Sequence, residues 1–92
     1  MQVKVEFLAQ ARHAAGGDDL TLELEPSTTL KTALLRVGAD LDDAARHGLF
    51  CETGQIRSSV LVLVNGQIVP MGDGRELIDG DTVTLLTPIG GG

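Results

Sequence analysis

The sequence has 92 residues, of which 42% are hydrophobic and 2% aromatic, and its formal net charge is −6 at pH 7. This length predicts one domain with a modest aliphatic core, which argues against an enzyme that works unaided in a deep cavity. The acidic balance argues against direct nucleic-acid binding, because such binding requires clustered Lys and Arg residues.

The single cysteine, Cys51, precludes an internal disulfide and a cysteine-based metal cluster. The segment from Met1 to Leu8 lacks the basic start and the continuous apolar stretch of a signal peptide. No apolar run approaches the roughly 20 residues that span a bilayer. The sequence therefore predicts a cytoplasmic protein with no membrane association and no bound metal.

The first half of the chain predicts a hairpin followed by a helix. Apolar and polar residues alternate over residues 2–8 and again over 20–24, which predicts two antiparallel strands joined by a flexible connection. Ser27 or Thr28 is expected to cap a helix from about Thr29 to Val37, with Gly38 ending it. The apolar stripe of this helix should lie on the sheet.

The second half of the chain predicts three further strands. Residues 39–58 carry only a short acidic helix, at 40–46, and an irregular stretch. The apolar strand 60–64 ends at Asn65-Gly66, which favours a type I′ turn, so residues 67–69 should pair back on it. A last strand, 82–86, follows the turn Asp79-Gly80-Asp81, whose aspartates we interpret as turn residues rather than paired catalytic carboxylates.

These elements predict an α+β fold in two layers, with one main helix on one face of the sheet. Strand 60–64 is aliphatic on both faces, so either its valines or Leu61 and Leu63 face away from the helix. The irregular segment 39–58 would cover that face in one interpretation. In the other, the face is an exposed apolar patch for docking.

The sequence ends in Ile89-Gly90-Gly91-Gly92, directly after the last strand. Glycine lacks a Cβ, so this end predicts a flexible tail to which another backbone can come close. One hypothesis is that the terminal carboxylate is the reactive group, and the alternative is an inert tail. Cys51, His13 and His47 are interpreted as structural or surface residues.

The order of three motifs resembles that of the MoaD/ThiS-type sulfur-carrier proteins, which belong to the ubiquitin-like β-grasp superfamily. The motifs are Val64-Asn65-Gly66, the segment 77–83 around the Asp-Gly-Asp turn, and Pro88-Ile89-Gly90-Gly91-Gly92. The resemblance implies a mixed sheet of four to five strands packed on one main helix, with the last strand beside the first. It also implies a β-grasp domain over residues 1–86 and a flexible glycine tail over 87–92.

In this family a partner enzyme uses ATP and Mg²⁺ to adenylate the terminal glycine, and a persulfide donor then leaves a thiocarboxylate. The resemblance assigns that role to Gly92 in a carrier that is activated in trans, is not an enzyme and binds no cofactor stably. Sulfur would pass to a synthase for molybdopterin or thiamine-type cofactors, or to a tRNA thiolase. The expected partner-binding residues are Pro88, Ile89, Gly90, Gly91 and Gly92, with Leu61 and Leu63 as further candidates.

Gly90 departs from the family pattern, which has a larger or polar residue before the final glycine pair. Two other hypotheses stay open at this point. One is a ubiquitin-like modifier that is joined through Gly92 to lysines of target proteins. The other is a β-grasp interaction domain whose tail is inert.

Overall fold

The computed structural model describes residues 1–14, 19–69 and 74–87. Within these residues the elements, in chain order, are β1 (Gln2–Ala9), α1 (Gln10–Ala14), β2 (Leu20–Glu23), α2 (Leu30–Asp40), α3 (Asp43–Leu49), β3 (Leu61–Val64), β4 (Gln67–Ile68) and β5 (Thr82–Thr87). The five strands form one sheet in the order β2-β1-β5-β3-β4. Among the described residues, no helix is both long and apolar enough to cross a membrane.

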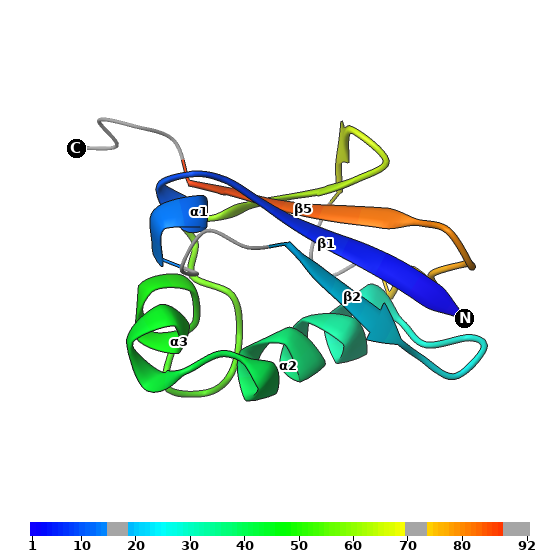
Figure 1. The fold of residues 1–92 in the computed structure, drawn as a ribbon, viewed down its shortest axis with the longest axis horizontal. Helices are drawn as coiled ribbons and strands as arrows, with labels where there is room; N and C mark the ends of the chain where they lie inside the picture. The colour runs from blue at the N-terminus through cyan, green and yellow to red at the C-terminus, as the bar shows by residue number, and fades with distance from the viewer. Residues whose placement is uncertain (15–18, 70–73, 88–92) are drawn as a thin grey trace.

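The sheet is mixed, because β1 and β5 run parallel while the other neighbouring strands run antiparallel. Figure 1 shows β1 and β5 side by side, with α2 and α3 gathered on one side of the sheet. The predicted mixed sheet on one main helix, with the last strand beside the first, is therefore confirmed. The parallel pairing of β1 and β5 lets the chain cross the sheet a last time and leave at the end where β1 meets α1.

The apolar stripe of α2 is buried as predicted, but both ends of the helix differ from the prediction. Thr29, rather than Ser27 or Thr28, is the N-cap, and its side chain accepts a 3.2 Å hydrogen bond from the Thr32 amide. Gly38 does not end the helix. It is buried beside the ring of Phe50, and its carbonyl accepts a 2.8 Å hydrogen bond from Arg46 Nε.

Two short helices depart from the sequence prediction. The flexible connection expected after residue 8 contains α1, which starts after Ala9 with a φ of 55° and buries Ala11 completely. The acidic helix expected at 40–46 is displaced to α3, because Asp42 caps it and accepts a 2.8 Å hydrogen bond from the Ala45 amide. The last strand, β5, runs one residue further than predicted, to Thr87.

The two faces of β3 are distinct in the structure. Val62 and Val64 are buried in the core together with Val60, whereas Leu61 and Leu63 are half-buried on the other face of the sheet. Residues 43–50 pack on the helix side, where Leu49 and Phe50 join the core. Leu61 and Leu63 therefore face away from the main helix, and the docking-patch interpretation is the one that their partial exposure favours.

Candidate functional site

The site forms at the end of the sheet where β5 stops. Thr87, its last residue, pairs with Ala9 of β1, and Figure 1 shows this end of β5 beside α1. The predicted reactive residue Gly92 and its predicted partner contacts Pro88, Ile89, Gly90 and Gly91 lie outside the described residues. The structure therefore shows where β5 ends, at Thr87, but it does not describe the residues that would react or bind a partner.

Apolar side chains gather on the open face of the sheet near this end. The register places Leu86 of β5 between Leu8 of β1 and Leu61 of β3, and it places Leu63 opposite Ile68 of β4. Leu8 is 40% exposed and Ile68 66% exposed, while the other three are half-buried. We call these five residues the open-face patch. Contiguous exposed apolar surface on a small domain marks an interaction site.

The rest of the open face is polar. Lys4 Nζ lies 3.9 Å from a Glu6 carboxylate oxygen and 3.8 Å from one of Asp19. The hydroxyl of Thr84, in the neighbouring strand, donates a 3.3 Å hydrogen bond to Glu6. The open face is therefore apolar beside Thr87 and over β3 and β4, and charged over β1 at Lys4 and Glu6, which gives a docking partner one preferred orientation.

Asn65 and Asp81 join the β3–β4 turn to the start of β5. Asp81 is only 5% exposed, and its carboxylate accepts hydrogen bonds of 2.9 Å from Asn65 Nδ2 and from the Ile78 amide. Asn65 Oδ1 in turn accepts from the Thr82 amide at 2.9 Å. Asn65 and Gly66 have φ values of 51° and 84°, which confirms the predicted type I′ turn.

Asp79, the other aspartate of the turn, ties the start of β5 to the start of β1. Asp79 Oδ1 accepts a 2.7 Å hydrogen bond from the Gln2 amide, and the Gly80 amide donates to the Gln2 carbonyl at 2.8 Å. The interpretation of Asp79 and Asp81 as turn residues is confirmed by these bonds. Their role is to hold β5 between β1 and β3, so that its far end, Thr87, lies beside the open-face patch.

Replacing Asp81 with Ala is expected to lower the free energy of unfolding by about 2–3 kcal/mol, because the Asn65 side-chain amide and the Ile78 N–H both lose the buried carboxylate that accepts their hydrogen bonds. Urea denaturation followed by circular dichroism measures the loss. Asp79→Ala is the matched control, since its exposed single bond should be worth about 1 kcal/mol or less. Equal losses in the two variants would contradict the assignment of the buried network to Asp81.

The remaining candidates do not converge on a site. Cys51, His13 and His47 are each exposed, and no three His, Cys, Asp or Glu side chains of the described residues come together to hold a metal.

The sequence analysis predicted two residues of the open-face patch, Leu61 and Leu63, but missed Leu8, Leu86 and Ile68. The signal was present, because each occupies the outward position of its alternating strand, but only the strand order brings them together.

Comparisons with known proteins agree with this geometry. The model of the ThiS family matches residues 5–92. The chain is 31% identical to small archaeal modifier protein 3 of Haloferax volcanii, over the full length of both proteins. It superposes on the crystal structure of SAMP1 from Haloferax volcanii with a TM-score of 0.84 and 22% identity, again over the full length of both chains. A putative molybdopterin converting factor, subunit 1, from Pyrococcus furiosus gives a TM-score of 0.67 at 27% identity, covering 96% of this chain and 98% of that one.

Proposed function

We propose that this chain, which belongs to the ThiS family, is a cytoplasmic sulfur carrier that a partner enzyme adenylates at the carboxylate of Gly92. The persulfide of a donor protein then displaces AMP and forms an acyl disulfide. A second thiol cleaves its S–S bond, which leaves the carrier as a thiocarboxylate and the donor in a disulfide with that thiol. Proteins of this type are small ubiquitin-like carriers that are not catalytic themselves. The observation that carries the proposal is the position of the open-face patch, which lies at the end of β5 that leads into residues 88–92.

The chemistry of activation requires a partner. A carboxylate is a weak nucleophile, and it attacks the α-phosphate of ATP only when both groups are held in line and the developing charge is stabilised. On the open face, Lys4 Nζ lies 3.9 Å from a Glu6 carboxylate oxygen, so its charge is already opposed by an acid. Five residues beyond Thr87 span at most about 18 Å when extended. The partner would therefore bind the open-face patch on its surface and receive Gly92 in its own catalytic site.

A second candidate function is protein modification through the same activated Gly92. The observation that favours it is the 31% identity to a protein named a small archaeal modifier, whereas the likeness to a protein named a molybdopterin converting factor subunit favours sulfur transfer. Both functions share the adenylation step. They differ in what attacks the activated carboxylate, which is a sulfur donor in the first and a lysine of a target protein in the second.

Intact-mass spectrometry of the protein purified from its own host, without alkylation, tests the proposal. We expect a fraction whose mass has increased by the replacement of one oxygen with one sulfur, with fragmentation placing the change at Gly92. Larger covalent species that contain the Gly92 carbonyl joined to a lysine would make protein modification the leading function. Only unmodified protein, with no such species in the lysate, would overturn both.

A further inference from the structure

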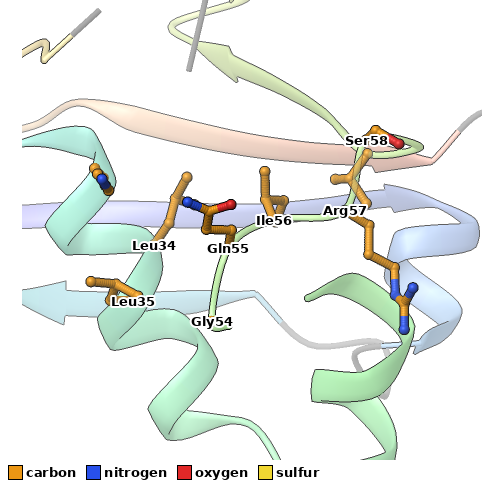
Figure 2. Close-up of a pocket in the computed structure, with 9 residues that line it drawn as sticks. Leu34, Leu35, Gly54, Gln55, Ile56, Arg57 and Ser58 are labelled. Carbon is orange, nitrogen blue, oxygen red and sulfur yellow. The ribbon is translucent and has the colours of Figure 1, made fainter. Parts of the chain in front are cut away.

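A groove lies between α2 and residues 54–60, in the helix layer and thus away from the open-face patch. Its volume is about 440 Å³. Leu34 and Val60 are buried at its base with the half-buried Ile56, and Leu35 at its rim is 47% exposed. Figure 2 shows these side chains of α2 facing the extended segment that carries Ile56. The groove therefore offers apolar surface along its length.

The backbone beside the groove has one free edge. The segment around Ile56 pairs along its other edge with the end of α3, where the Cys51 amide donates to the Gln55 carbonyl at 2.7 Å and the Arg57 amide donates to the Leu49 carbonyl at 2.9 Å. Because successive backbone groups of an extended chain point to opposite edges, the N–H and C=O of Ile56 point toward α2. Neither group is hydrogen-bonded to another described residue.

The charge of the groove is opposite to that of the protein. Its lining includes Lys31 and Arg57 but no Asp or Glu, although the chain has a net charge of −6. Lys31 forms no ion pair with any other described residue. Arg57 Nε donates a 2.8 Å hydrogen bond to the carbonyl of His47, so its charge is not neutralised by an acid there. An acidic ligand would therefore be favoured at this position.

We propose that this groove binds an extended segment of a partner protein that has an aliphatic side chain next to an acidic residue. The segment would pair with the N–H and C=O of Ile56, as a strand added to a free edge, and place its aliphatic side chain against Leu34. Its acidic residue would lie beside Lys31. A free backbone N–H and C=O beside apolar side chains fit a peptide better than a compact small molecule. The groove lies in the helix layer, away from the open-face patch, so it would remain available while another protein holds that patch and Gly92.

Titration of the ¹⁵N-labelled chain with the blocked peptide Ser-Val-Asp-Ile-Asp-Val-Ser, whose central isoleucine is next to both aspartates, tests the proposal by NMR. We expect amide shifts confined to α2 and residues 54–58, with the largest shift at the Ile56 amide. A peptide in which both aspartates are replaced by lysine should bind at least about fivefold more weakly. The same should hold for a peptide whose central isoleucine is replaced by serine.

Two pairs of variants separate the groove from the rest of the surface. Lys31→Glu should weaken binding about fivefold, whereas Lys4→Glu, with the same change in net charge, should leave it unchanged. Leu35→Ser should weaken binding to a similar degree, whereas Ile68→Ser on the open face should not. The spectrum of each variant verifies its fold before titration.

Three results would overturn the proposal. They are the absence of shifts at millimolar peptide, equal binding of the aspartate and lysine peptides, and shifts that map to Leu61 and Leu63 instead of the groove. The titration involves no activation of Gly92, so its failure is distinguishable from a failure of the proposed sulfur-carrier function.

Discussion

Deletion of Gly91 and Gly92 is expected to abolish adenylation of the protein by the activating enzyme of its host. The shortened chain would still end in a carboxylate, that of Gly90, but this group would fall short of the partner's catalytic site by about 7 Å. A displacement of only 1 Å can cost about 100-fold in rate, so two missing residues should reduce turnover to background. ATP–pyrophosphate exchange with the purified activating enzyme measures the loss, and intact-mass spectrometry should find no thiocarboxylate.

Replacement of Gly90 with Ser is the matched control. It keeps the length of the tail and places a larger, polar residue before the final glycine pair, which matches the family pattern at that place. We expect this variant to retain measurable exchange. Full exchange by the Gly91–Gly92 deletion would contradict the assignment of Gly92, whereas the absence of exchange by the unaltered protein would favour the interaction domain with an inert tail.

The β-grasp fold was predictable because its main elements carry strong local periodicity. Alternation over residues 2–8 specifies the buried face of β1, and the stripe through Leu30 and Leu34 specifies the buried face of α2. Asn65-Gly66 and Asp79-Gly80 mark the turns, since glycine accepts positive φ at both. The likeness to solved ubiquitin-like structures confirms the fold expected from the MoaD/ThiS resemblance.

The departures from prediction come from tertiary contacts that a local pattern does not contain. Gly38 looks like a helix end, but packing against Phe50 and a hydrogen bond from Arg46 carry α2 to Asp40. The helix α1 has five residues, too few for periodicity to be read, and Ala11 is buried where α1 packs against β1, α3 and β5. Short helices depend on packing more than on propensity.

The residues of the candidate sites also differ in whether the sequence predicts them. Gly92 comes from the end of the sequence and the family resemblance, and it stays a prediction because it lies outside the described residues. Leu61 and Leu63 were predictable as candidates because strand 60–64 is aliphatic on both faces. The groove beside α2 was not, because Lys31 and Ile56 are 25 positions apart in the sequence. Only the packing of α2 against the segment after α3 brings them to one surface.

Replacing Leu61 with Lys is expected to reduce the kcat/KM of the activating enzyme for this carrier by about 30- to 1,000-fold, which corresponds to a loss of about 2–4 kcal/mol at the centre of an interface. Leu61 neighbours Leu86 on the open face, close to where the chain leaves β5. Lysine can lay its aliphatic stem on the half-buried surface and keep its ammonium group in water, so the fold should persist. The ammonium group would then have to be desolvated for the partner to dock.

Leu35→Lys is the matched control, because it makes the same substitution at an exposed leucine on α2, away from the open-face patch. We expect its kcat/KM for activation to stay within about twofold of the original protein, as is usual for residues outside the energetic centre of an interface. Thermal unfolding of both variants shows whether either has lost stability. If Leu61→Lys were folded and activated normally, the activating enzyme would have to dock elsewhere. If both variants lost activity equally, the position of docking would include α2, and the open face would not be sufficient to explain recognition.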